Sequence, residues 1–190
     1  MPSAFGTPVT TANRFGAAPA AQSFTLVTTL TASASATLSY TSFSAASYPS
    51  YLLILSDIMN TTDLQVLRVQ ASVNGGSSYP ASWNFVLVAN SGTSLNVGTA
   101  AGGSAYMELS RSAYNGYGVG ISGFLYLNFG QTSGRFSHLA GQTGDIRTGD
   151  NPGVQLCKGV FTESSPINAL KFLFASGNIT SGNIKIYGIT

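Results

Sequence analysis

The 190-residue chain carries very little charge. Eight basic and six acidic side chains make up 7% of the sequence, against roughly 25% in an average soluble domain. The basic residues are scattered from Arg14 to Lys185, whereas a nucleic-acid-binding protein gathers them into one positive patch. We therefore expect no nucleic acid among the partners of this protein.

Cysteine, histidine and long apolar runs are also scarce. Cys157 is the only cysteine and His138 the only histidine, which excludes an internal disulfide and a zinc site built on several cysteines. The longest aliphatic run, residues 52–55, is far shorter than the roughly 20 residues of a membrane-spanning helix. We expect no cofactor and no membrane insertion.

Helical periodicity is absent from the sequence, and the pattern favours strands. Ser, Thr and 22 glycines are typical of short strands joined by turns. The clearest strand is 67–73, where apolar and polar residues alternate before a turn at Asn74–Gly76. The continuous apolar run 51–55 is typical of a strand covered on both faces. Further strands are expected within 24–43 and at 83–88, 105–109, 119–129, 154–161, 170–175 and 184–189.

These nine or ten strands predict an all-β fold, an antiparallel β-sandwich of jelly-roll type. It should occupy residues 22–190. Residues 1–21, rich in Ala, Pro, Gly and Thr, show neither strand nor helix periodicity and predict an extended N-terminal arm. Phe5, Val9 and Phe15 are spaced along this arm, and we expect them to anchor it to a neighbouring protein.

Four segments resemble a family of bacteriophage and prophage virion proteins that occur in tail fibres and related surface appendages. They are 51–57 (YLLILSD), 67–79 (LRVQASVNGGSSY), 135–143 (RFSHLAGQT) and 168–189 (NALKFLFASGNITSGNIKIYGI). The last is the most specific, because the family typically closes with a Phe-Leu-Phe strand, a Ser-Gly-Asn bend and a Lys-x-Tyr-Gly-Ile ending. The resemblance extends from about residue 22 to the end.

The resemblance implies a β-sandwich module that serves as a trimeric or otherwise multimeric part of a phage particle and has no enzyme activity. The expected location is the virion surface, as a tail fibre, head fibre or decoration protein, and the expected partners are other capsid or tail proteins. An alternative is a lectin-like module that binds a host surface polysaccharide. The low charge independently predicts a homo-oligomer, because so few charged groups do not keep a lone subunit apart from its copies.

Candidate catalytic groups are few. Gly118–Gly123 fits the G-x-G-x-x-G dinucleotide motif, but the aromatic alternation that follows it predicts a strand rather than the required helix. A catalytic His138 would need an adjacent nucleophile and carboxylate, so a hydrogen-bonded strand histidine is the favoured interpretation. Cys157 follows an apolar neighbour and is expected to pack as a small hydrophobic residue. Six carboxylates are too few to predict the groove of a glycosidase.

Two short segments remain as candidate binding sites. Asp145, Asp150 and Asn151, in the segment TGDIRTGDN, supply oxygen ligands that could hold calcium, although a pair of Asx turns is the favoured interpretation. Tyr114, Asn115 and Tyr117 lie in the loop 112–118 (SAYNGYG). Their flat, amphipathic rings are typical of sugar recognition and of protein interfaces, so this loop is the candidate receptor contact.

Overall fold

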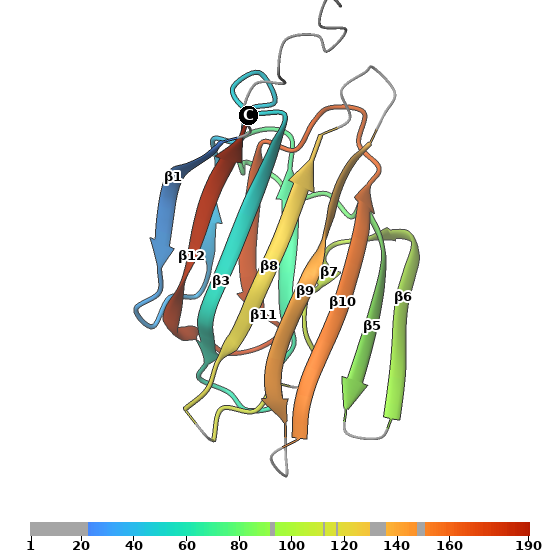
Figure 1. Cartoon of the computed structure of the whole chain (residues 1–190). Helices are drawn as coiled ribbons and strands as arrows, with labels where there is room; N and C mark the ends of the chain where they lie inside the picture. Colours follow the sequence, from blue (N-terminus) through green and yellow to red (C-terminus); the bar gives the residue numbers. More distant parts are fainter. Residues whose placement is uncertain (1–22, 92–93, 112, 117, 130–135, 148–150) are drawn as a thin grey trace, which may run out of the picture.

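A computed structural model describes residues 23–91, 94–111, 113–116, 118–129, 136–147 and 151–190. Over these residues the chain forms twelve strands in two antiparallel sheets, and it has no helix (Figure 1). The predicted antiparallel β-sandwich is confirmed. The absence of any helix from the described residues also means that none of them forms a helix able to cross a membrane.

The two sheets differ in width. Across the larger sheet the order is β1 (Phe24–Thr31), β12 (Ile179–Ile189), β3 (Ser50–Asn60), β8 (Ile121–Asn128), β9 (Ser137–Arg147), β10 (Asn151–Phe161), β5 (Trp83–Ser91) and β6 (Ser94–Ser104). The smaller sheet contains β2 (Leu38–Tyr40), β11 (Ala169–Phe174), β4 (Leu67–Ser72) and β7 (Met107–Glu108).

The strand pairing is nested from the ends of the chain inward. β1 pairs with β12, β2 with β11, β3 with β8 and β4 with β7. This is one long antiparallel hairpin rolled up into two four-stranded sheets, which is the jelly-roll topology. Two further hairpins, β5–β6 and β9–β10, are inserted into it and extend the larger sheet beyond β8. The larger sheet therefore has eight strands where the smaller has four.

One apolar core joins the jelly roll to the inserted hairpins. Leu53 of β3 and Phe172 of β11 are completely buried between the sheets. Trp83 of β5 and Phe161 of β10 are also completely buried, with ring centroids 5.2 Å apart. Because these two rings belong to the same core cluster as the jelly-roll side chains, the hairpins are part of the sandwich.

Strand positions confirm much of the sequence pattern, with three corrections. β6 and β9 were not predicted, because their segments are rich in Gly, Ser, Thr and Asn, which disfavour strands. The strand expected at 105–109 is reduced to Met107–Glu108. The turn expected at Asp145 is wrong, since Asp145 lies inside β9 and its backbone pairs with Gly153 of β10.

Candidate functional site

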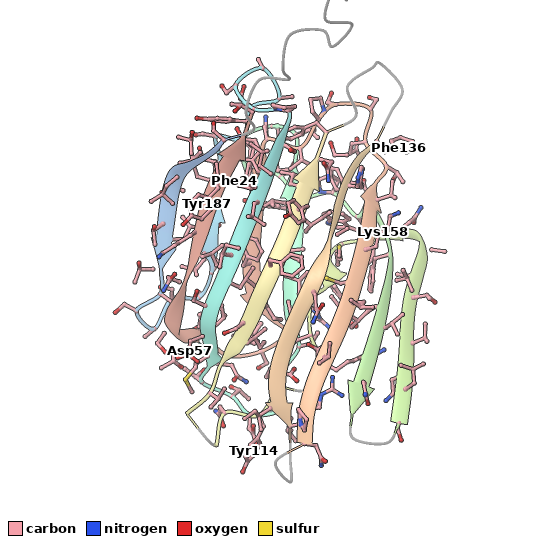
Figure 2. All side chains as sticks on the ribbon, in the orientation of Figure 1. Phe24, Asp57, Tyr114, Phe136, Lys158 and Tyr187 are labelled. Carbon is pink, nitrogen blue, oxygen red and sulfur yellow. The ribbon has the colours of Figure 1, made fainter. Side chains whose placement is uncertain are left out.

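The face of the larger sheet that points away from the smaller sheet, here called the outer face, is the most unusual surface of the molecule. Among the described residues no element packs over it (Figures 1 and 2). Strand register decides which side chains lie on it. One row of directly paired residues consists of Lys185, Ile54, Phe124, Gln142, Leu156, Val88 and Val97. The next row consists of Leu26, Tyr187, Leu52, Tyr126, Ala140, Lys158, Val86 and Thr99.

The outer face is apolar from one edge of the sheet to the other. Nine of its large apolar side chains are between 37% and 70% exposed: Phe24, Leu26, Val86, Leu95, Val97, Phe124, Tyr126, Val154 and Leu156. The strands that carry them extend across the whole larger sheet, from β1 at one edge to β6 at the other. This width is roughly 34 Å at the usual strand spacing. Isolated exposed apolar residues are common in soluble proteins, but a continuous surface of them marks an interaction site.

The outer face carries two charged side chains in its paired rows, and both are basic. Lys158 and Lys185 are exposed on it, and His138 is half-buried beside Lys158. Burial, with a smaller contribution from the Lys158 ammonium, lowers the pKa of His138 below its ordinary 6.5. None of the carboxylates that the structure describes belongs to either paired row or to the nine exposed apolar positions.

The opposite surface of the sandwich, on the smaller sheet, has a different composition. There the Arg68 guanidinium lies 3.8 Å from the Glu108 carboxylate and 3.8 Å from the centroid of the Tyr106 ring. The Lys171 ammonium lies 3.8 Å from the centroid of the Tyr79 ring. Charged groups on this surface are therefore paired within the subunit, and the continuous apolar character is confined to the outer face.

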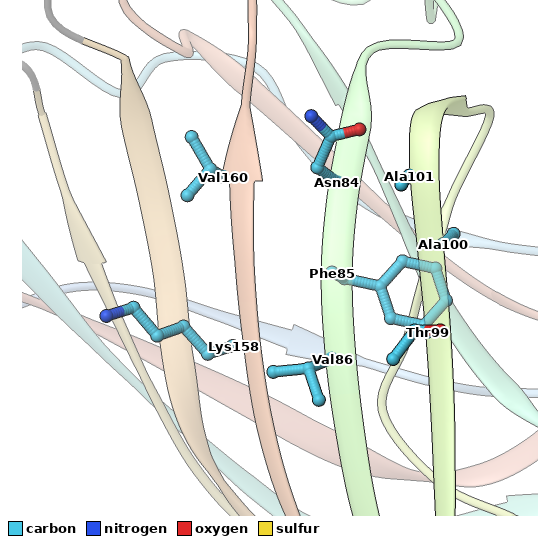
Figure 3. Close-up of a pocket in the computed structure, with 8 residues that line it drawn as sticks. All are labelled: Asn84, Phe85, Val86, Thr99, Ala100, Ala101, Lys158 and Val160. Carbon is cyan, nitrogen blue, oxygen red and sulfur yellow. The ribbon is translucent and has the colours of Figure 1, made fainter.

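Two shallow grooves indent the outer face. One, of about 280 Å³, is lined by Phe24, Leu52, Ile54 and Tyr187. The other, of about 370 Å³, lies over β10, β5 and β6, with Lys158 and Val160 on one side and Thr99 and Ala101 on the other (Figure 3). Both are open and mainly apolar. They are suited to receive side chains of a partner protein.

The loop that contains Tyr114 and Asn115 lies at the end of the sandwich opposite the C-terminus (Figures 1 and 2). Both residues are half-buried. The Asn115 side-chain amide donates hydrogen bonds to the carbonyls of Asn60 and Thr61, at 3.3 and 3.4 Å. The Tyr114 backbone amide donates to the carbonyl of Ile146 at 3.1 Å. The Asn115 side chain thus connects the loop to the end of β3 and the start of the β3–β4 connection by hydrogen bonds. Tyr117 lies outside the described residues.

A buried polar cluster occupies the inner side of β9 and β10. Asp145 Oδ1 accepts hydrogen bonds from Gln155 Nε2 at 3.1 Å and from Arg147 Nε at 3.3 Å. Gln155 Oε1 accepts from the Thr143 hydroxyl at 2.9 Å. Burial raises the pKa of Asp145 above its ordinary 3.8, although Gln155 and Arg147 act in the opposite direction. Gly153 leaves room for the cluster, because a Cβ there would lie 2.7 Å from Arg147 Nε.

This cluster bears on the calcium hypothesis. The Arg147 guanidinium already lies against the Asp145 carboxylate, so Asp145 is not presented as a free ligand for a cation. Asn151 is exposed at the start of β10, and Asp150 lies outside the described residues. Within the part of the chain that is described, no three His, Cys, Asp or Glu side chains are grouped to hold a metal ion.

The structure also shows where Cys157 and the glycine motif 118–123 lie. Cys157 is buried on the inner side of β10, and burial raises the pKa of its thiol to about 12. The expectation that it packs as a small hydrophobic residue is confirmed. The glycine motif leads into strand β8, and a Cβ on Gly120 would lie 2.5 Å from the backbone carbonyl carbon of Asp57. The strand predicted after the glycine motif is confirmed.

The arm residues Phe5, Val9 and Phe15 lie outside the described residues. The described chain begins at Ser23, whose hydroxyl oxygen is 2.8 Å from that of Thr190 at the C-terminus. The first described residue, Ser23, therefore lies at the end of the sandwich opposite Tyr114 (Figures 1 and 2). No family model, curated protein or experimentally determined structure matches this chain.

Proposed function

We propose that this chain is a structural subunit of a bacteriophage particle. It forms part of a multimeric surface appendage, a tail fibre, head fibre or decoration protein, that residues 1–21 anchor to the capsid or tail. One observation carries the proposal: the outer face is mainly apolar across its whole width, so a lone subunit would expose a large apolar area to water. The phage setting is supported by the resemblance of four sequence segments, one of which (168–189) contains β11 and β12.

The proposed role is binding and assembly rather than catalysis. His138 lies on the outer face, where no described carboxylate is placed to orient its imidazole for general-base chemistry. The Cys157 thiol is buried and, with a pKa of about 12, stays protonated at neutral pH. The most prominent described surface thus offers burial area rather than a reactive group.

Particle incorporation tests this proposal. Phage particles would be purified from cells that carry the genome encoding this chain, and the chain would be detected by mass spectrometry and by immunogold labelling. The expected result is several copies per particle at a surface position. A variant that lacks residues 1–21 should fold, as judged by circular dichroism, and be missing from the particles. Purified particles without the chain would refute the proposal.

A second candidate function is recognition of a host surface polysaccharide. It is favoured by the position of Tyr114, at the end of the sandwich farthest from the point where the arm enters. An appendage fastened through its arm would present that end to the host. A Tyr114→Ala variant should reduce adsorption of particles to host cells without changing incorporation, and a glycan array without any binding would refute this role.

A further inference from the structure

The outer face does not complement itself electrostatically. It carries Lys158, Lys185 and His138, and none of the described carboxylates belongs to its two paired rows: Asp57 lies near the end of β3, beside Ser122, and Asp145 is buried. Two outer faces pressed together would enclose four lysines, and their paired rows would supply no described carboxylate to pair with them. A buried ammonium without a partner carries a large desolvation cost. Face-to-face packing of two copies is therefore disfavoured by charge, although it is favoured by apolar area.

The apolar area is nevertheless of the size that a stable interface requires. The nine exposed side chains are on average about half exposed, which leaves on the order of 700 Å² at roughly 150 Å² per side chain. The largest apolar patch of a typical monomer is roughly 300–600 Å², and a standard protein interface buries about 800 Å² per partner. The outer face exceeds the first value and approaches the second.

The composition of the patch indicates the chemistry of its occupant. Six of the nine side chains are Leu or Val, which fill apolar pockets but offer neither a stacking ring nor a hydrogen bond to a sugar. A protein surface that combines apolar side chains with carboxylates would satisfy both the aliphatic area and the two lysines. The chain itself has four described carboxylates that lie outside the two paired rows and are not fully buried: Asp57, Asp63, Glu108 and Glu163.

We propose that the outer face binds a second copy of this chain in a heterologous contact, against a different, carboxylate-bearing surface of that copy. The inference rests on the proposed function, since it specifies how the subunits of the appendage meet. Heterologous contacts repeat from copy to copy and close into rings when the rotation allows it. Lys158 and Lys185 then pair with carboxylates across the contact, and the apolar rows between them are buried.

Substitutions on the outer face test where the copies meet. Phe124 and Leu156 are 40% and 55% exposed. Replacing both by Gln introduces polar side chains of moderate size at positions that already contact water, so the fold should survive. Sedimentation should show association at least roughly tenfold weaker than that of the unmodified chain. The control is the circular dichroism spectrum of the double variant, which should match that of the unmodified chain and so show that weaker association does not come from a lost fold. Undiminished association of the double variant would overturn the proposal.

Neutralising the lysines tests the mode of contact. In a face-to-face pair, replacing Lys158 and Lys185 by Met would remove unpaired charges and tighten association. In the heterologous contact it removes ion pairs, so association should weaken roughly tenfold, and its sensitivity to added salt should fall. Tighter association of the Lys158→Met, Lys185→Met variant would overturn the heterologous arrangement.

The unmodified chain completes the experiment. If it sediments as a single subunit at micromolar concentration, the proposed contact is wrong and the outer face belongs to another partner; binding to vesicles of anionic phospholipid would then identify a lipid surface. Particle incorporation is scored separately. A chain that is present in particles while its outer-face variants associate normally would overturn this contact and leave the proposed function standing.

Discussion

Gly159→Ala is a sharp test of how the inserted hairpins are packed. Gly159 lies on the inner side of β10, directly beneath the Trp83 ring. A Cβ added there would lie 2.9 and 3.0 Å from Cε3 and Cζ3 of Trp83, and 2.5 Å from the Met107 sulfur. The methionine can move aside, but the Trp83 ring is completely buried and in contact with Phe161. Overpacking of this kind costs about 1–3 kcal/mol.

The matched control is Gly144→Ala in the neighbouring strand β9. A Cβ there would be 3.5 Å from the Gly153 carbonyl oxygen, which is an ordinary contact. Alanine in a strand interior is favoured over glycine by roughly 0.5–1 kcal/mol, so this variant should be neutral or slightly stabilised. Urea unfolding at one fixed protein concentration would measure both, because association adds to apparent stability. If Gly159→Ala is as stable as Gly144→Ala, the described packing beneath Trp83 is wrong.

Three further outcomes follow from buried or hydrogen-bonded groups. Because the pKa of Asp145 is raised in the folded state, the folded protein holds this proton more tightly than the unfolded chain does, and the contribution of Asp145 to stability falls as the pH rises from 3.8 through the raised value. Asp145→Asn should flatten that part of the curve of unfolding free energy against pH. An unchanged curve would contradict the raised pKa of Asp145. The Cys157 thiol, with its pKa raised to about 12, should resist a thiol reagent in the folded protein at neutral pH and react fully in denaturant, whereas rapid native labelling would show that it is accessible. Asn115→Ala removes the hydrogen bonds to Asn60 and Thr61 and should lower the free energy of unfolding by about 1 kcal/mol, measured in urea.

The fold class was predictable because most strands carry their own signal. In β4, apolar Leu67 and Val69 alternate with polar neighbours, and the structure buries the apolar side. β6 and β9 have no such signal, since they contain glycine and hydroxyl residues that suit a loop equally well. The backbone of β9 is paired on both sides, with β8 and β10. β9 is therefore a strand because β8 and β10 form hydrogen bonds with both of its edges. The pattern of apolar and polar residues within one segment does not show which other segments will pair with it.

The candidate site was predictable only in outline. Low charge predicted self-association, but the residues of the outer face come from strands spread between Phe24 and Tyr187, and only the register brings them together. The buried cluster around Asp145 was missed for a similar reason. Its partner Gln155 is ten residues away along the chain but directly accessible across the β9–β10 hairpin, whereas the sequence predicts a turn at Asp145.

The apolar run of β3 connects the sequence to the proposed assembly. A continuous run such as 51–55 is typical of a strand covered on both faces. In the described fold, Tyr51, Leu53 and Leu55 are buried against the smaller sheet, whereas Leu52 and Ile54 lie on the outer face and are only half-buried. A strand that needed one cover would alternate with polar residues on the other side, as β4 does. The sequence of β3 is therefore that of a strand in a three-layered arrangement, and the described residues supply two of the three layers. The contact proposed with a second copy of the chain would supply the third layer, over the apolar area that the outer face exposes.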